Sequence, residues 1–376
     1  MKLLIVIGTR PEAIKMAPLI KRFSEENEFI LRVCNTGQHK DLLDPILNFF
    51  KIKVYYNLKS MVYNQGLTGL TTSILDNMEA VFDDFKPDYV LVHGDTTTSF
   101  AASLAAFYSG IKIAHIEAGL RTHDKYSPFP EEINRSLTAK LADIHFTPTI
   151  TAKENLYAEG IIKNVFITGN TVIDALYDAI NLINEDDEEI QNLIQILNCN
   201  KKIILFTGHR RENFGDSFNE IFTCLNQLTN DRDDIEIVYP VHPNPNIKKV
   251  AFNFFNDNEK VHLIEPLNYG PFVWLLKKSH IILTDSGGIQ EEAPSLGKPV
   301  LVLREVTERP EAVNAGTVIL VGSNQEKIRN MITLLLDNDD YYNKMASINN
   351  PYGDGKASER IINNFKLFLN KPSNDK

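Results

Sequence analysis

The sequence contains little cysteine, and this excludes two kinds of site. Its three cysteines, Cys34, Cys199 and Cys224, are too few and too scattered for a disulfide framework or a zinc site. Histidines and carboxylates do not recur at metal-ligand spacing either. We therefore expect no metal and no cofactor, and we expect the cysteines to be small buried residues in a reducing, cytoplasmic compartment.

The chain also lacks a basic charge excess and long apolar runs. The net charge of -10 argues against nucleic-acid binding, which usually needs a basic face. No apolar run approaches the roughly 20 residues of a membrane span, and the opening MKLLIVIGTRPEA turns polar early, which favours a first strand over a signal peptide. We expect neither nucleic acid nor membrane as a partner, while local arginines and helix N-termini still suit an anionic small ligand.

Short strand-like runs alternate with helical stretches almost throughout the chain. Residues 3–8 (LLIVIG) predict a strand and residues 11–23 a helix, and the alternation continues to about residue 169. It restarts at KKIILFTGH, after a helical segment with an acidic middle. Such alternation is typical of parallel sheets covered by helices, and a single core rarely exceeds roughly 250–300 residues. The sequence therefore predicts an α/β protein of two Rossmann-like domains, 1–169 and 170–355, that face a central cleft.

Three acidic residues occupy positions that favour proton transfer. Asp95 ends the apolar run YVLVHGD, Glu117 ends KIAHIEAG, and Glu131 opens a helical stretch. Ligands bind at the carboxyl ends of strands in open α/β sheets, so acids placed there predict acid–base chemistry. Glu131 and Arg135 are four apart on one helix face; they form either an ordinary ion pair or a carboxylate kept ionised by its basic neighbour.

The segment TDSGGIQEEAPSLGKPVLVLR predicts a diphosphate cradle. A strand ends at Asp285, and Ser286, Gly287 and Gly288 lead into a short helix whose backbone N–H groups and dipole favour an anion. Glu292 lies one turn into that helix, where it could bind the ribose hydroxyls. The alternative is a plain turn, and Arg309 in the next loop is either a further positive charge for the ligand or a surface residue.

Two more strand-to-helix turns carry basic residues. IGTRPEAIKMAPL does not match G-x-G-x-x-G, which disfavours a dinucleotide site. Arg10 in this turn suits phosphate oxygens, while Lys15, one turn later, is equally well explained as a solvated helix residue. His209 in TGHRRENFG is a candidate for phosphate binding or proton transfer, and His242 in YPVHPNP is more ambiguous.

Taken together, these segments resemble one family, the non-hydrolysing UDP-N-acetylglucosamine 2-epimerases. The resembling blocks run in order through nearly the whole chain, from GTRPEAIKMAPL and GQH through HIEAGLRTHDKYSPFPEEINR to TERPEAVNAGT and NPYGDG. The resemblance implies a glycosyltransferase-B-like fold in which the C-terminal helix, within residues 356–376, crosses back to the first domain. It also implies a homodimer.

The resemblance implies interconversion of UDP-GlcNAc and UDP-ManNAc through elimination of UDP to 2-acetamidoglucal and its re-addition. By this resemblance Asp95, Glu117 and Glu131 are the acid–base carboxylates and His209 contacts the diphosphate, while the face of C2 that each acid serves stays open. The other residues that the resemblance assigns to the substrate are Leu267 and Phe272 at uracil, Glu292 at ribose, Ser286, Gly287 and Gly288 at diphosphate, and Arg10, Lys15, Arg135 and Arg309 at phosphate or the carboxylates.

One segment departs from the family pattern. Bacterial members often bind a second UDP-GlcNAc as an activator, and the residues here that match that site are Gln38, His39, Arg210 and His242. Asp41, however, stands where a Gln is often found, and no Arg lies near 60–70. An acid facing a second diphosphate is unfavourable, so we expect weak or altered substrate activation.

Three rival hypotheses share the same nucleotide site. A UDP-sugar glycosyltransferase of this fold would need an acceptor groove and has little use for three acids. A related epimerase acting on another UDP-2-acetamido sugar is harder to separate, because loops build the sugar pocket. A nucleotide-sugar-binding regulator without turnover is disfavoured by the intact set Asp95, Glu117, Glu131 and His209.

Overall fold

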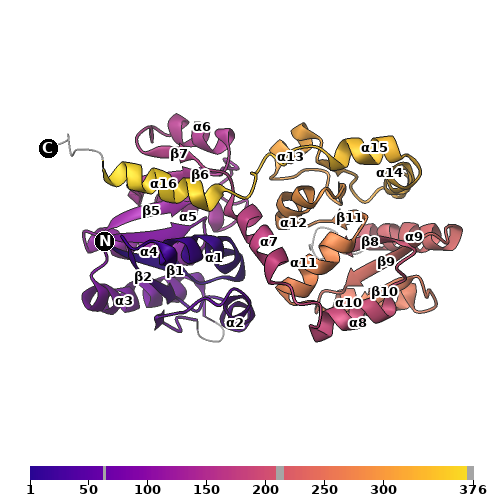
Figure 1. Ribbon diagram of the computed structural model, residues 1–376, viewed down its shortest axis with the longest axis horizontal. Helices are drawn as coiled ribbons and strands as arrows, with labels where there is room; N and C mark the ends of the chain where they lie inside the picture. Colours follow the sequence, from indigo (N-terminus) through magenta and orange to yellow (C-terminus); the bar gives the residue numbers. More distant parts are fainter. Residues whose placement is uncertain (62–64, 209–215, 371–376) are drawn as a thin grey trace. The chain divides into compact units, whose positions relative to one another are not determined.

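A seven-stranded parallel sheet forms the centre of the first of two units in the computed structural model, which describes residues 1–61, 65–208 and 216–370 (Figure 1). This unit comprises Met1–Asp178 and Tyr352–Lys376, and the second unit comprises Ala179–Pro351. These divisions fall at 178/179 and 351/352, compared with 169/170 and 355/356 from the sequence.

The strands of the first unit follow the order β3-β2-β1-β4-β5-β6-β7. Their bounds are β1 Lys2–Ile7, β2 Ile30–Asn35, β3 Tyr56–Asn57, β4 Tyr89–His93, β5 Lys112–Ile116, β6 Ile144–Thr147 and β7 Val165–Ile167. The helices are α1 Arg10–Glu25, α2 Lys40–Phe49, α3 Leu67–Phe85, α4 Thr97–Tyr108, α5 Glu131–Leu141, α6 Ile150–Ala158, α7 Thr171–Leu182, which continues past the division, and α16 Ala357–Leu369.

The second unit repeats this plan with a six-stranded parallel sheet in the order β10-β9-β8-β11-β12-β13. Its strands are β8 Lys202–Thr207, β9 Ile235–Pro240, β10 Val261–Ile264, β11 Ile281–Thr284, β12 Val300–Val302 and β13 Val318–Leu320. Its helices are α8 Glu188–Ile196, α9 Asp216–Asp231, α10 Pro245–Phe255, α11 Tyr269–Lys278, α12 Gly287–Glu292, the 3₁₀ helix η2 Ala293–Leu296, α13 Pro310–Ala315, α14 Gln325–Asp337 and α15 Asp339–Ala346.

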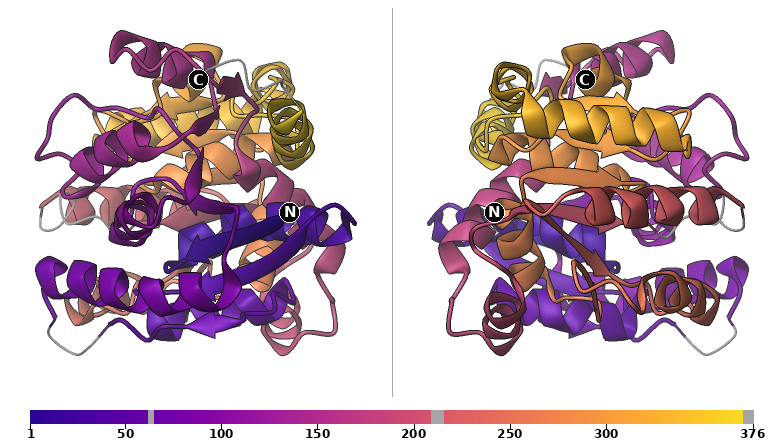
Figure 2. Two further views of the ribbon diagram at one scale, coloured as in Figure 1. Left: turned by 90° about the vertical axis from the view of Figure 1, so that its left-hand side faces the viewer. Right: turned by 90° about the vertical axis from the view of Figure 1, so that its right-hand side faces the viewer.

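The predicted α/β class with two Rossmann-like domains is confirmed by these two sheets. Central strands are apolar on both faces because helices cover both sides: residues 3–7 of β1 are fully buried (Figure 2). In each unit the strand order reverses beside the first strand, between β1 and β4 and between β8 and β11. Ligands bind at such reversal points, at the carboxyl ends of the strands.

The C-terminal helix α16 packs on the first unit, as predicted. Phe365 is fully buried, and its ring lies 5.9 Å from that of Phe23, 6.0 Å from that of Phe29 and 5.0 Å from that of Tyr89. Asp174 of α7 accepts hydrogen bonds from the first two backbone N–H groups of α16, at 3.0 and 2.8 Å. The helix α16 therefore contributes to the hydrophobic core of the first unit, and α7 caps the N-terminus of α16. Within the described ranges, no helix has the length and apolar character needed to cross a membrane.

Candidate active site

Asp95 and Glu117 lie just beyond the carboxyl ends of the neighbouring strands β4 and β5. The chain turns sharply after each strand. Gly94 adopts φ 63° and Glu117 adopts φ 59°, and the second value is unfavourable for a residue with a Cβ. Strained backbone of this kind persists where the surrounding structure enforces it, and it is common at functional sites. An ideal Cβ on Gly94 would lie 3.7 Å from Glu117 Oε1, so the two turns bring the side chain of Glu117 over the neighbouring strand end.

Three side chains surround one oxygen of the Glu117 carboxylate. Lys15 Nζ forms an ion pair with Glu117 Oε2, and Asn170 Nδ2 donates a hydrogen bond of 2.9 Å to the same atom. His93 Nε2 lies 3.7 Å from it. The Glu117 side chain is only 9% exposed, so these contacts act in a partly desolvated site. The ammonium and amide groups favour the ionised form of Glu117.

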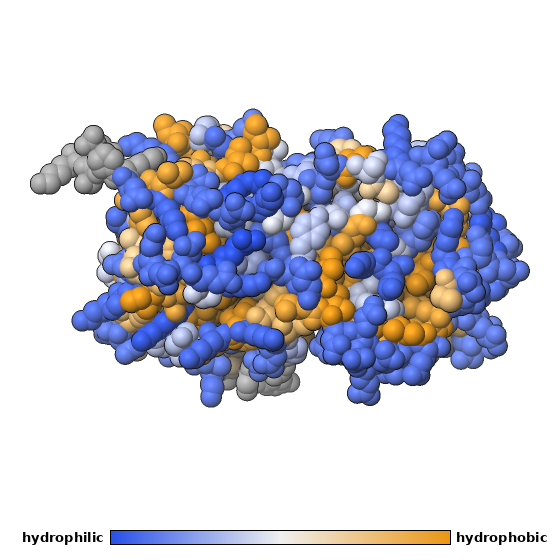
Figure 3. Space-filling model, in the orientation of Figure 1, coloured by the Kyte–Doolittle hydropathy of each residue, from blue (hydrophilic) through white to orange (hydrophobic). Residues whose placement is uncertain are grey.

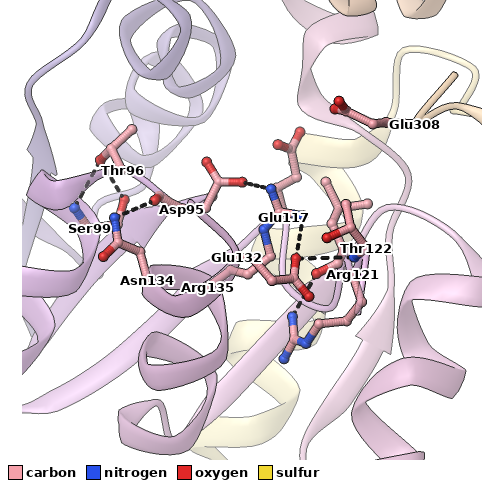
Figure 4. Close-up of polar contacts among 12 residues, drawn as sticks. Asp95, Thr96, Ser99, Glu117, Arg121, Thr122, Glu132, Asn134, Arg135 and Glu308 are labelled. Atoms are coloured by element: carbon pink, nitrogen blue, oxygen red, sulfur yellow. Dashed lines mark hydrogen bonds and ion pairs between the residues drawn. The ribbon is translucent and has the colours of Figure 1, made fainter. Parts of the chain in front are cut away.

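Asp95 is held by the helix α5. Arg135 Nη2 donates to Asp95 Oδ2 at 2.6 Å, and Asn134 Nδ2 donates to the Asp95 backbone carbonyl at 3.0 Å (Figure 4). Burial raises the pKa of Asp95; the charge of Arg135 opposes this shift, and those of Glu117 and Glu131 add to it. A carboxyl group that senses two neighbouring carboxylates resists being ionised together with them, which suits a site where one acid gives a proton as another takes one.

The expected pairing of Glu131 with Arg135 is wrong. Besides Asp95, Arg135 contacts Glu132, three residues before it, at 3.3 Å from Nη1 to Oε2. Glu131 Oε2 is buried and, among the residues that the structure describes, has no hydrogen-bond partner. Helix spacing permits a pair between Glu131 and Arg135. The guanidinium bonds Asp95 instead, because the fold places Asp95 within its reach. A buried carboxylate oxygen without a partner is costly unless a ligand or water occupies its place.

Sequence reasoning missed four residues that organise this site: Glu12, His93, Glu132 and Asn170. Glu132 accepts from the backbone N–H groups of Thr122 and His123 at 3.1 and 3.0 Å, which fixes the loop before α5 (Figure 4).

Glu12 is the one of these four for which the sequence carried a signal. Its carboxylate accepts from Gly8 N and Thr9 N, and from the hydroxyls of Thr96 and Ser99, so it joins the N-termini of α1 and α4. The pattern T-x-x-E in TRPE is a capping box and could have revealed it. His93, Glu132 and Asn170 are recognised only from their contacts in the folded structure.

In the second unit, α12 begins directly after the buried strand β11, as predicted. An ideal Cβ on Gly287 would come no nearer than 3.8 Å to another residue, and one on Gly288 no nearer than 4.0 Å. A Cβ at either position would meet only ordinary van der Waals contacts, so the packing of the chain does not itself require glycine there. Glycine does let a ligand approach the backbone closely, as a cradle requires. Glu292, at the end of α12, is 8% exposed and accepts a 3.0 Å hydrogen bond from the hydroxyl of Tyr269.

The hydrogen bond from Tyr269 joins α12 to the start of α11. Leu267 precedes that helix and Phe272 lies in its first turn, and both are partly exposed. The structure thus brings the predicted uracil and ribose residues into one region. Arg309 lies there too, since its Nε donates to Glu291 of α12.

The remaining predicted residues are dispersed. Arg10 is the first residue of α1 and is partly exposed. Gln38 accepts hydrogen bonds from the backbone N–H and hydroxyl of Thr98 at 3.1 and 2.8 Å, and His39 is exposed at the start of α2. His242 Nδ1 accepts from Asn244 N at 3.2 Å. His209 and Arg210 lie outside the described residues.

Comparison with known proteins decides the family. The family model described as "UDP-N-acetylglucosamine 2-epimerase" matches residues 21–366. The chain belongs to this family. It is 54% identical over 369 residues to the UDP-N-acetylglucosamine 2-epimerase of Campylobacter jejuni, covering 96% of each chain. It is 51% identical over 370 residues to that of Escherichia coli K12, covering 97% of this chain and 98% of the relative.

Solved structures of family members have the same fold. The UDP-GlcNAc 2-epimerase of Neisseria meningitidis, solved bound to UDP-GlcNAc, is similar at a TM-score of 0.88 and 51% identity, covering 98% of this chain and 100% of that one. The enzyme of Methanocaldococcus jannaschii, solved with UDP-GlcNAc and UDP, is similar at a TM-score of 0.80 and 35% identity, with 98% and 100% coverage. The glycosyltransferase-B-like fold expected from the sequence is that of the family.

Proposed function

We infer that the protein interconverts UDP-GlcNAc and UDP-ManNAc by eliminating UDP to 2-acetamidoglucal and adding it back with the opposite configuration at C2. The observation that carries this inference is Asp95, whose carboxyl senses the charges of Glu117 and Glu131, in the first unit of a chain that matches the epimerase family nearly end to end. The C2 hydrogen has no neighbouring carbonyl to acidify it. Departure of UDP from C1 builds positive charge there, and this charge makes the C2 proton removable.

Inversion at C2 requires a proton to leave one face of the sugar and return to the other, so two acid–base groups are needed. Asp95, Glu117 and Glu131 supply them. Burial raises the pKa of Asp95, which supports Asp95 as the carboxyl that holds a proton, while Lys15 and Asn170 support an ionised Glu117. Arg135 orients Asp95 through their 2.6 Å hydrogen bond.

Residues of the second unit bind the nucleotide in this proposal. The backbone N–H groups of Ser286, Gly287 and Gly288 receive the diphosphate, with added positive charge from Arg309. Glu292, oriented by Tyr269, accepts hydrogen bonds from the ribose hydroxyls, and Leu267 and Phe272 contact uracil. His209 and Arg10 stabilise the negative charge of the leaving diphosphate.

Incubation with UDP-GlcNAc in D₂O, followed by ¹H NMR, tests the reaction. We expect deuterium at C2 and a mixture of UDP-GlcNAc and UDP-ManNAc, because the proton that returns comes from solvent-exchanged carboxyl groups. An absence of C2 exchange would refute the epimerase activity. Release of free ManNAc would identify hydrolysis instead, and transfer of the sugar to an added acceptor would identify a glycosyltransferase.

We also propose that the protein is a homodimer and that it works in the cytoplasm. Apolar side chains are visible on the surface of both units (Figure 3), and on α4 of the first unit Phe107 and Tyr108 are 59% and 73% exposed, which is typical of a partner-binding surface. All three cysteines are free thiols, which suits a reducing compartment. Cys34 and Cys224 are buried as expected, but Cys199 is exposed. Light scattering after gel filtration should give twice the chain mass of 42.6 kDa; a monomer mass at micromolar concentration contradicts the dimer.

A further inference from the structure

His93 is the last residue of β4, and its imidazole is buried directly beneath the candidate acid–base groups. In the β4–β5 ladder it lies opposite Ile116, the residue before Glu117. The side chain is 5% exposed, and Nε2 lies 3.7 Å from Glu117 Oε2. Among the described residues, Nε2 has no hydrogen-bond partner. A buried ring nitrogen without a partner destabilises the fold, so it calls for a functional explanation.

The imidazole presents a lone pair to the carboxylate. Burial lowers the pKa of His93 to about 4, more than the charge of Glu117 raises it, so the ring is neutral at neutral pH. The residue's own backbone carbonyl raises the pKa of the ring, which indicates that a ring N–H faces that oxygen. Because Nε2 has no hydrogen-bond partner among the described residues, the ring proton is assigned to Nδ1 and Nε2 is an acceptor.

An acceptor nitrogen cannot bond an ionised carboxylate, but it can bond a protonated one. We propose that His93 is a positioning residue for Glu117, and that its Nε2 accepts a hydrogen bond from the Glu117 carboxyl when that group is protonated during turnover. A movement of about 0.8 Å from the present separation gives ordinary hydrogen-bond length. The proposal rests on the acid–base role of Glu117 given above.

The proposed bond balances the other contacts of Glu117. A group that takes a proton from C2, or returns one to it, is a carboxylate at one stage of the cycle and a neutral acid at another. Lys15 and Asn170 stabilise the carboxylate, while His93 stabilises the neutral acid. While the bond to His93 exists, the proton remains on the Glu117 oxygen, and His93 contributes only the acceptor. With both forms stabilised, proton transfer in either direction meets a smaller free-energy difference.

The other charged groups near His93 come from neighbouring elements. Lys15 extends from α1, and His115 lies on β5. Glu12 on α1 connects through Ser99, whose hydroxyl lies within hydrogen-bond distance of both Glu12 Oε1 and the His93 backbone carbonyl and can donate its proton to either. Asp95 follows His93 by two residues and senses the charges of Lys15 and Glu117.

Two substitutions that differ by one methylene group test the proposal. In His93→Gln the amide end reaches the place of Nε2 and can still accept from Glu117. In His93→Asn the amide replaces Nδ1 only, so the acceptor is lost. His145 is the matched control, because it is 2% exposed on the next strand but one and burial lowers its pKa to about 4 as well.

The readouts are the pH profile of kcat for C2 exchange, KM, and the pKa of Glu117 from ¹³C NMR of its carboxyl carbon. For His93→Asn we expect the Glu117 pKa, and the limb of the kcat profile that it sets, to move about 0.5–1 unit toward lower pH. We also expect kcat to fall about fivefold, with KM little changed because His93 does not contact substrate. His93→Gln and His145→Asn should keep the wild-type Glu117 pKa and pH profile.

An unchanged Glu117 pKa in His93→Asn overturns the proposal, and so does a shift of equal size in His93→Gln. The NMR titration needs no turnover. A wild-type protein without C2 exchange would therefore refute the proposed activity, while the titration would still decide whether His93 bonds the protonated carboxyl.

Discussion

In the proposed mechanism, residues of the first unit divide into acids that transfer protons and neighbours that hold those acids in place. Glu117 adopts a backbone conformation that is unfavourable for any residue with a Cβ, and Lys15 and Asn170 bond its carboxylate. Arg135 likewise bonds the carboxylate of Asp95. A carboxylate that is fixed in place before substrate binds loses little entropy as the reaction proceeds.

Removal of either acid should abolish most turnover without removing nucleotide binding. We expect Asp95→Asn and Glu117→Gln to lower kcat by about 10²–10⁴-fold, because general acid–base catalysis contributes that much. UDP affinity, measured by calorimetry, should stay within about threefold of wild type, since neither substitution changes a residue that we propose to contact the nucleotide. Asp44→Asn on α2, which changes the charge equally outside the carboxylate group, is the control. A near-wild-type rate in either variant would remove that residue from the mechanism.

Among the elements, strands β4, β5 and β6 each carry one buried histidine: His93, His115 and His145. His115 lies opposite His145 in the ladder, and His115 Nε2 bonds the carbonyl of Gly94 at 2.7 Å. Burial lowers the pKa of His115 to about 3, and those of the other two to about 4. The fold therefore holds three neutral imidazoles beneath its candidate site.

Acid should destabilise the fold through these histidines. Between pH 6.5 and about 4 the unfolded chain binds a proton at His145 that the folded chain does not, so stability present above pH 6.5 is lost as the pH falls. We compare the free energy of unfolding of wild type with that of His145→Gln. The wild-type value minus the variant value should decrease by about 1.4 kcal/mol for each unit by which the pH falls across this window. Denaturant titrations at several pH values measure this difference.

The matched control is His123→Gln, because His123 is exposed. The difference between wild type and His145→Gln should change more steeply with pH than the difference between wild type and His123→Gln. A His145→Gln difference that does not change with pH would show that His145 is not held neutral in the folded protein.

At the scale of the whole molecule, one Rossmann-like plan occurs twice and carries two kinds of site. The two sheets share the same strand order, but the first has acids after β4 and β5 while the second has a glycine-containing turn after β11. This difference matches the two parts of a nucleotide sugar. The sugar requires proton transfer, and the diphosphate requires backbone N–H groups and positive charge.

Regulation by substrate should be weak in this protein. Asp41 and the absence of an Arg near 60–70 disfavour a second diphosphate at the segment that includes Gln38 and His39. We expect the initial rate to rise hyperbolically with UDP-GlcNAc, and UDP-ManNAc alone to be converted without a lag. Asp41→Gln should strengthen activation, and Asp44→Asn on the same helix should not. Sigmoidal UDP-ManNAc kinetics in wild type, rescued by a trace of UDP-GlcNAc, would contradict this.

Much of the fold and part of the site could be predicted because they depend on local pattern. Apolar runs such as LLIVIG and YVLVHGD specify buried parallel strands, and an acid that follows such a run must emerge at the carboxyl edge of the sheet. This reasoning predicts the positions of Asp95 and Glu117 after strands and of the turn at Ser286 before a helix, and the structure has them there. The sequence also places Glu131 and Arg135 on one helix, as the structure does. Their predicted pairing is wrong, because helix spacing shows only that two side chains are close enough to bond, and Arg135 bonds Asp95 and Glu132 instead.

By itself, the sequence determined the strand and helix alternation, the parallel sheets and the acids at strand ends, since each follows from residues close together in the chain. Only the tertiary structure decided which partners those acids have. Lys15, Asn170 and His93 reach Glu117 across 102, 53 and 24 residues of chain respectively. Pairwise contacts at such separations depend on how strands are ordered and how side chains compete for one oxygen, and no local pattern encodes that competition.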